Sequence, residues 1–337
     1  MKREFRLSSR REFFGSSAGT LAILTAIATQ RGQASAKGAS EPYTYDLSRY
    51  QKTDAKLISH AEVARWKSPR PDARRLGIGP DDTLYICAGN HVTAMSAAGE
   101  RGLEIALDGP ACCVAVAKSG EIYVGLRDHV EVFNPKGERQ ATWESPGKKV
   151  WLTAIAVTEK DVFVADSGAR ALLRYDRSGK LMRRLGERNK ERNVPGFIVP
   201  SPFLDVEVAG DGLLRVNNPG RHRVETYTAD GDFEGAWGRP TAAIQGFCGC
   251  CNPISLALLP DGRFVTCEKG LPRVKIYSAS GEFESVVAGV ETFAENGKVC
   301  GPTDCTAGGL DAVVDSQGRI WILDFVTGEV RGMKAKA

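Results

Sequence analysis

Three cysteines fall within four positions of one another in the segment spanning residues 246–253. Cys248, Cys250 and Cys251 are interrupted only by Gly249, and Asn252-Pro253 follows them directly. Because glycine and proline interrupt regular structure, we expect a loop here rather than a helix or a hydrogen-bonded strand. Thiols this close together on a loop favour metal ligation, disulfide formation or thiol–disulfide exchange.

Two more groups of cysteines could join such a site. Cys300 and Cys305 bracket a Gly-Pro-Thr-Asp segment, and Cys112 and Cys113 are adjacent. Iron–sulfur clusters are held by sets of cysteine thiolates, and Zn²⁺ and Cu⁺ also bind thiolates well. The spacing therefore favours an iron–sulfur cluster or another thiolate-bound metal as cofactor. Its predicted ligands are Cys248, Cys250, Cys251, Cys300 and Cys305.

Two other interpretations of the cysteines stay open. The C-x-C-C and C-x4-C spacings differ from a standard ferredoxin motif, and disulfides such as Cys300–Cys305 often cross-link loops in exported proteins. Adjacent cysteines form a disulfide only with a strained peptide, and a total of nine cysteines leaves at least one thiol over. Alternatively, the thiols form a redox centre in which Glu268, Lys269 or Arg75 tunes the thiolate character.

The first 36 residues have the composition of a targeting peptide. Residues 9–14 read Ser-Arg-Arg-Glu-Phe-Phe, residues 19–28 are mildly apolar, and residues 34–36 read Ala-Ser-Ala. This order resembles a twin-arginine export signal followed by a cleavage site. We therefore predict a signal peptide over residues 1–36 and a periplasmic mature protein. The apolar stretch is too short to span a bilayer, and we predict no transmembrane segment in the mature chain.

The formal charge of +4 comes from this predicted signal peptide. Residues 1–36 carry six basic and two acidic side chains, and the rest of the chain has 39 of each sign. A balanced surface gives no reason to expect nucleic acid or an anionic membrane as a partner. We expect a monomer that meets a redox partner protein or a small molecule.

A repeat of about 40–50 residues begins near residue 73 and occurs six times. Each copy contains an apolar run that ends at a Gly or Asp turn, a β-rich run, and an alternating run that closes at a glycine. In the fourth copy these are residues 206–212, 214–216 and 224–231. Period-two alternation with Asp-Gly and Ser-Gly turns predicts antiparallel hairpins. We therefore predict an all-β protein, a six-bladed β-propeller over residues 73–337 with four antiparallel strands per blade.

The sixth copy ends after its third strand, at residues 329–333. Closing the ring then requires an outer strand from another part of the chain. Residues 56–66, within an N-terminal extension at residues 37–72, are the available candidate. Closure would remove the open sheet edges that otherwise invite aggregation.

The units resemble NHL repeats, in which Asn, Arg or His stands before the third strand. The matching triplets are Asn90-His91-Val92, Asp128-His129-Val130, His222-Arg223-Val224 and Pro272-Arg273-Val274. The resemblance covers residues 73–333 and implies the propeller fold, but it implies little about function because propellers host enzymes, binding proteins and scaffolds alike. It also places His91, His129 and His222 at or beside structural positions, so we do not expect these histidines to be metal ligands.

Aligning the six copies identifies one residue in each at the start of the first strand, which lines the channel of a propeller. These residues are Arg75, Cys113, Ala154, Asp205, Ser255 and Asp311. The two cysteine loops lead into the first strands of the neighbouring fifth and sixth blades, so we expect both at one mouth of the channel. Residues expected beside them, as contributors to cofactor binding, are Cys112, Cys113, Glu268, Lys269 and Arg273.

Two cysteines are expected to differ from these. Cys87 stands near the end of a strand, where a buried thiol behaves as a small hydrophobic side chain. Cys267 has the equivalent position in the fifth blade and is a weaker candidate for the site.

The predicted function is an exported propeller that holds a thiolate-ligated metal or iron–sulfur centre at the channel mouth, for electron transfer or metal handling. One alternative is a binding scaffold without catalytic activity, whose cysteines cross-link loops. Another is a lactonase- or lyase-like enzyme that uses the channel acids Asp205 and Asp311. The sequence assigns no catalytic residue for the main prediction.

Overall fold

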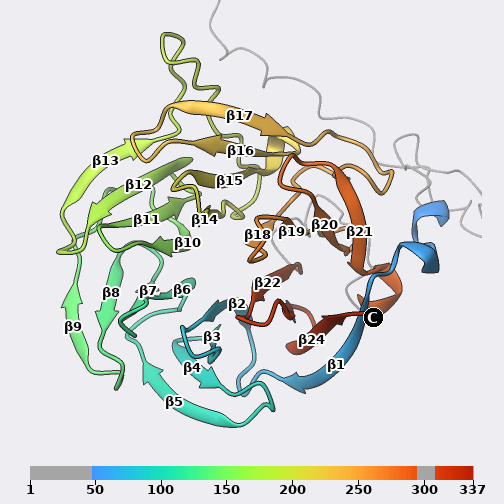
Figure 1. Cartoon of the computed structure of the whole chain (residues 1–337). Coiled ribbons are helices and arrows are strands. Elements are labelled where there is room, and N and C mark those ends of the chain that lie inside the picture. Colours follow the sequence, from blue (N-terminus) through green and yellow to red (C-terminus); the bar gives the residue numbers. More distant parts are fainter. Residues whose placement is uncertain (1–47, 294–307, 337) are drawn as a thin grey trace, which may run out of the picture. The chain divides into compact units, whose positions relative to one another are not determined.

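The computed structural model describes residues 48–293 and 308–336, and these residues form six four-stranded antiparallel sheets. The sheets follow one another in chain order around a central axis, as the blades of a ring (Figure 1). The predicted six-bladed propeller is therefore confirmed. No helix within the described residues is long and apolar enough to cross a membrane.

The first three blades are each formed by four consecutive strands, of which the first lies innermost. Blade 1 contains β2 (Ala73–Ile78), β3 (Leu84–Ala88), β4 (His91–Met95) and β5 (Arg101–Ala106). Blade 2 contains β6 (Cys113–Val116), β7 (Ile122–Gly125), β8 (Val130–Phe133) and β9 (Arg139–Thr142). Blade 3 contains β10 (Leu152–Val157), β11 (Asp161–Asp166), β12 (Ala171–Asp176) and β13 (Leu181–Leu185).

The other three blades repeat this order, except that the last one takes its outer strand from the N-terminal part of the chain. Blade 4 contains β14 (Val206–Val208), β15 (Leu214–Asn218), β16 (Arg223–Tyr227) and β17 (Phe233–Trp237). Blade 5 contains β18 (Ser255–Leu258), β19 (Phe264–Cys267), β20 (Val274–Tyr277) and β21 (Phe283–Ala288). Blade 6 contains β22 (Leu310–Val314), β23 (Ile320–Asp324), β24 (Glu329–Ala335) and β1 (His60–Lys67). Short 3-10 helices lie at Ser48–Tyr50, Ala55–Leu57, Pro219–Arg221 and Val290–Phe293.

Asp-Gly turns join the first and second strands of blades 4 and 5. In blade 4 the turn glycine, Gly212, has φ of 79°, a conformation that side chains with a Cβ disfavour. Its N–H donates to Ala209 O at 2.9 Å, and the N–H of Ala209 donates to Leu213 O at 3.0 Å. These two bonds close the hairpin and set the register in which Val206 pairs with Val216. The glycine is thus required by the turn that positions the innermost strand.

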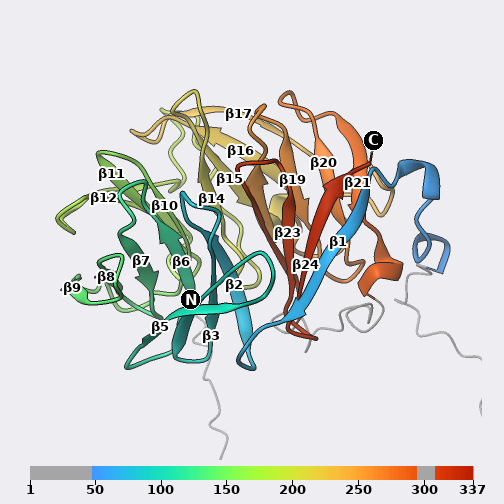
Figure 2. The ribbon, with the colours of Figure 1, turned by 60° about the horizontal axis from the view of Figure 1, so that its bottom comes forward.

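Strand β1 closes the ring by pairing antiparallel with β24. The two lie side by side in Figure 2, and Trp66 of β1 packs on Trp321 with ring centroids 6.4 Å apart. The predicted closing strand is confirmed, although it begins four residues later than the expected residue 56. The reason is local: the Asp54 side chain accepts the Lys56 N–H and starts a 3-10 turn at Ala55–Leu57.

The core lies mainly between the faces of neighbouring blades. Val265 and Ile276 of blade 5 belong to the same buried cluster as Leu310 and Ile322 of blade 6. Each such side chain contributes about 1.5–3 kcal/mol when fully buried. Since every blade packs on two others, the inner strands are held at fixed positions around the channel.

Candidate functional site

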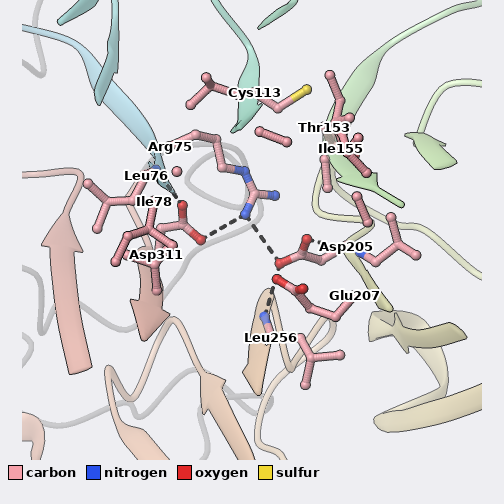
Figure 3. A pocket seen from close by; sticks show the side chains of 18 of the residues that line it. Arg75, Leu76, Ile78, Cys113, Thr153, Ile155, Asp205, Glu207, Leu256 and Asp311 are labelled. Carbon is pink, nitrogen blue, oxygen red and sulfur yellow. Dashed lines mark hydrogen bonds and ion pairs between the residues drawn. The ribbon is translucent and has the colours of Figure 1, made fainter. Parts of the chain in front are cut away.

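The innermost strands surround a cavity of about 210 Å³ at the centre of the ring. Five of the six aligned residues line it, as the repeat alignment leads one to expect: Arg75, Cys113, Ala154, Asp205 and Asp311. The sixth, Ser255, donates its hydroxyl to Asp311 Oδ1 at 2.6 Å. The predicted convergence of these first-strand residues is therefore confirmed (Figure 3).

Arg75 spans the channel between two acids. Its Nη1 lies 3.0 Å from Asp311 Oδ1 and 3.5 Å from Asp205 Oδ2, which links blade 1 to blades 6 and 4. Burial acts to lower the pKa of the guanidinium, but Asp311 and Asp205 outweigh it and raise that pKa. Arg75 is therefore a permanent positive charge inside the channel.

The two acids also bind backbone amides of neighbouring blades. Asp311 accepts the N–H of Leu76 at 2.7 Å, and Asp205 accepts the N–H of Leu256 at 2.9 Å. Asp205 also accepts the N–H of Val206 at 3.0 Å. Burial raises the pKa of Asp205, while Arg75 opposes that rise. Because both carboxylates already accept several protein hydrogen bonds, they are better suited to holding blades together than to acting as catalytic acids.

Glu207 differs from these two acids. It follows Asp205 by two residues on β14, lines the cavity, and is the only charged side chain at its level of the channel among the described strands. The equivalent residues of the other blades are Gly77, Ala115, Ala156, Ala257 and Val313. No hydrogen bond to its carboxyl is made by any residue in the described part of the chain.

The environment of Glu207 changes its acidity. The side chain retains partial exposure because it borders the cavity, yet protein atoms surround it on most sides. Burial raises the pKa of Glu207 to about 8, and the negative charges of Asp205 and Asp311 add to the rise. A carboxyl with such a pKa is mainly protonated near neutrality and can both donate and accept a proton. Sequence reasoning missed it, although a glutamate among small residues was a usable signal.

The cysteine loop is held from several sides. The Cys248 N–H donates to Glu268 Oε1 at 3.0 Å, and the Asn252 side-chain amide donates to the carbonyl oxygens of Cys248 and Lys269. The Asn252 side chain also accepts the Lys269 N–H at 2.9 Å. From blade 4, His222 Nε2 donates to Gly249 O at 2.6 Å. The loop therefore has a defined position beside blades 4 and 5.

Glu268 is the centre of a buried charge cluster beneath this loop. Arg273 donates to both of its oxygens at 2.7 and 2.9 Å, and Lys275 Nζ lies 3.0 Å away. Lys275 also donates to the carbonyl oxygens of Ile244 and Gly246, at 3.1 and 2.6 Å. The Glu268, Arg273 and Lys275 side chains are at most 2% exposed.

The charges in this cluster shift one another's pKa values. Burial would raise the pKa of Glu268, but Lys275 and Arg273 bring it below its ordinary value. Burial lowers the pKa of Lys275 to about 8, against the opposing effect of Glu268. Burial also raises the pKa of the Cys248 thiol, and the negative charge of Glu268 adds to this. Sequence reasoning missed Lys275, which alternation places on the polar side of its strand.

The three charged residues predicted beside the loop have different roles. Glu268 and Arg273 do lie beneath it, and their hydrogen bonds go to the backbone and to each other. Lys269 points elsewhere: its Nζ donates to Ser201 Oγ at 3.1 Å and lies 4.4 Å from the centre of the Phe203 ring. These contacts assign Glu268 and Arg273 to anchoring the loop.

The described cysteines do not form a single group. Cys250 Sγ and Cys251 Sγ are 3.1 Å apart in the loop, with Cys248 nearby in the chain. Cys113 instead lines the central cavity, where Arg75 acts to lower its pKa, although burial raises that pKa well above the ordinary range of a thiol. Cys87 and Cys267 are fully buried in strands, as expected for Cys87.

The predicted metal centre gains no support from these cysteines. Within residues 48–293 and 308–336, no three His, Cys, Asp or Glu side chains converge closely enough to hold a metal ion. Cys113 lines the central cavity and Cys112 Sγ is directed to Pro110 O, and no contact joins either of them to the loop cysteines among these residues. Cys300 and Cys305, which the prediction also needs, lie outside the described residues.

Comparison with known proteins identifies the fold. No protein-family model matches the chain, and no curated protein sequence does. A streptogramin B lyase structure is similar with a TM-score of 0.56 and 11% identity, over 83% of this chain and 99% of that one. The virginiamycin B lyase of Staphylococcus aureus is similar with a TM-score of 0.52 and 13% identity, over 81% of this chain and 98% of that one. A protein of unknown function from Bacteroides thetaiotaomicron is similar with a TM-score of 0.57 and 15% identity, over 82% of this chain and 72% of that one. These proteins share the propeller fold.

Proposed function

We propose that this propeller is a lyase-type enzyme that acts on a small molecule in its central channel, with Glu207 as the group that transfers a proton. The observation that carries the proposal is the Glu207 carboxyl itself. It borders a cavity, accepts no hydrogen bond from the described residues, and has a pKa of about 8. Carboxyls with such properties in a cavity are candidate general acids and bases.

The charges around the cavity favour certain substrates. Asp205 and Asp311 are paired with one guanidinium, so the cluster carries an excess of negative charge when Glu207 is protonated. An anion would be repelled from this site, whereas an uncharged or cationic molecule would not be. The cavity of about 210 Å³ suits a small organic molecule, and Ile78, Ile155 and Val208 give it apolar walls.

The reaction class follows from the groups present and from the fold. Glu207 can remove or supply a proton, which is the step that an elimination requires. Two proteins with the same fold are described as lyases, which supports this class over the predicted electron transfer. The earlier lyase-like hypothesis based on Asp205 and Asp311 is thus kept for the channel, with the acid–base role moved to Glu207.

Turnover provides the direct test. Small uncharged, cationic and anionic compounds are screened for binding by thermal shift, with virginiamycin B included, and each binder is followed by NMR for bond cleavage. We expect binders among the uncharged and cationic compounds only. Glu207→Gln should lower kcat by about 100-fold or more while binding is retained. Undiminished turnover in this variant would contradict the assignment of Glu207, and binding confined to anions would contradict the charge argument.

The acidity of Glu207 can be checked without a substrate. The folded protein retains this proton between about pH 4.3 and the folded pKa of about 8, whereas the unfolded chain has lost it. The free energy of unfolding therefore falls as the pH rises through this window. Because Glu207→Gln lacks the titration, its stability relative to the wild type should increase by about 4 kcal/mol between about pH 5 and about pH 8.5.

Urea unfolding of both proteins across this pH range measures the effect. The matched control is Glu234→Gln, which removes an exposed carboxyl from the outer strand β17 of the same blade. Its stability relative to the wild type should not change with pH. A flat difference for Glu207→Gln as well would mean that Glu207 titrates as an ordinary carboxyl.

A further inference from the structure

The adjacent residues Cys250 and Cys251 bring their sulfur atoms to 3.1 Å from each other, although no disulfide joins any two of the described cysteines. We propose that these two thiols form a reversible disulfide between neighbouring residues by exchange with a small external disulfide. The proposal is independent of the channel chemistry, because it concerns a loop outside the central cavity.

The two thiols differ in their access to solvent. Cys250 is exposed, whereas Cys251 is 1% exposed. An external disulfide can therefore be attacked by Cys250 but cannot reach Cys251. This division between an attacking and a resolving cysteine is the arrangement that exchange through a mixed disulfide requires.

The surroundings keep the two sulfurs together. The side chain of Asn252, directly after the pair, donates to the carbonyl oxygens of Cys248 and Lys269 and accepts the Lys269 N–H. Before the pair, Gly249 O accepts from His222, and Cys248 N–H donates to the buried Glu268. Since both flanks are fixed, little conformational entropy remains to be lost when the disulfide closes.

The exchange balances in two steps. The Cys250 thiolate attacks one sulfur of the external disulfide and releases its other half as a thiolate. The Cys251 thiolate then attacks Sγ of Cys250 and releases the second half. The external disulfide gains two electrons, and the protons of both cysteine thiols pass to solvent or to the released thiolates. A disulfide between adjacent residues is strained, so an added dithiol should reverse the reaction readily.

The chain contains an internal comparison. Cys112 and Cys113 are also adjacent, but Cys112 Sγ is directed to Pro110 O at 3.6 Å, and Cys113 is buried at the channel. Adjacency in sequence is therefore not enough to bring two sulfurs together. We expect the first pair to remain reduced under conditions that oxidise Cys250 and Cys251.

Alkylation followed by mass spectrometry tests the proposal. The whole protein is equilibrated with oxidised glutathione, alkylated without reduction, and digested with trypsin. Because Arg239 precedes Pro240 and resists cleavage, one peptide, residues 224–263, carries Cys248, Cys250 and Cys251 and no other cysteine. We expect this peptide to carry one alkyl group and to lack two hydrogens after oxidation, and to carry three alkyl groups after added dithiothreitol.

Single substitutions identify the pair. Cys248→Ser should still lose two hydrogens and take no alkyl group, whereas Cys251→Ser should stop at a glutathione adduct on Cys250. Cys112→Ser is the matched control from the other adjacent pair and should oxidise in the loop like the wild type. Loss of the disulfide in Cys248→Ser, a cross-link from this peptide to residues 299–319, or three alkyl groups after oxidation would each overturn the proposal.

Discussion

Arg75→Met should lower the free energy of unfolding by about 3–5 kcal/mol near neutral pH, because it leaves two buried carboxylates without their cation. Arg75 is 6% exposed, and it contacts Asp205 and Asp311 from across the channel. Methionine keeps much of the apolar volume of the arginine stem, so the loss reports mainly on the missing charge. Chemical unfolding of the purified variants measures it.

The pH dependence of this loss separates charge from packing. Burial already raises the pKa of Asp205 while Arg75 opposes that rise, so removing Arg75 should raise it further. The folded variant then holds a proton that the unfolded chain has released, and its stability falls as the pH rises. The deficit should therefore be larger at about pH 8 than at about pH 5.

Two further variants complete this test. Arg74→Met removes the neighbouring exposed arginine and should change stability by less than about 0.5 kcal/mol. Combining Arg75→Met with Asp205→Asn and Asp311→Asn removes all three charges and should recover part of the loss. A triple variant as unstable as Arg75→Met alone, or a stability deficit of Arg75→Met that does not vary with pH, would show that the network stabilises the fold through packing and not through charge.

The blades and the channel could be predicted from the sequence because both follow from local periodicity. Alternating apolar runs and Asp-Gly turns fix strands and hairpins, and copies of one unit can be aligned with each other. That alignment correctly placed Arg75, Asp205 and Asp311 together, although the two aspartates follow Arg75 by 130 and 236 positions in the chain. The missing fourth strand of the last copy likewise predicted the closure by β1.

The partners of polar side chains could not be predicted in this way. Alternation marks Lys275 as a residue on the polar side of β20, yet it is fully buried. The cause is the segment that precedes blade 5 in the chain, which folds over Lys275. Its Ile244 O, Gly246 O and Phe247 ring contact the Lys275 Nζ. Such a cover depends on tertiary contacts that no local pattern records. For the same reason, cysteine spacing alone did not reveal how Glu268 and Asn252 anchor the cysteine loop, and the metal centre that it favoured stays a prediction.

Glu268→Gln should also cost about 3–5 kcal/mol of stability, with the opposite pH dependence. The variant leaves Arg273 and Lys275 buried without the carboxylate that both contact. Burial already lowers the pKa of Lys275 to about 8, and loss of Glu268 should lower it further. The unfolded chain then binds the proton that the folded variant lacks, so the stability of the variant rises with pH. Its deficit should therefore be larger at about pH 7 than at about pH 9.5.

Glu284 provides the matched control, because its side chain and that of its partner Arg263 are 37% and 40% exposed, so that the pair is not buried. Glu284→Gln should change stability by less than about 0.5 kcal/mol at either pH. Glu268→Gln should also loosen the loop, because an uncharged amide oxygen accepts the Cys248 N–H more weakly than the carboxylate does, so that Cys248 alkylates faster than in the wild type. Equal deficits at both pH values, together with unchanged alkylation, would mean that Glu268 neither holds Lys275 charged nor anchors the loop. If both predictions hold, Arg75→Met and Glu268→Gln respond to pH in opposite directions. That difference distinguishes a cluster with excess buried acid from one with excess buried base.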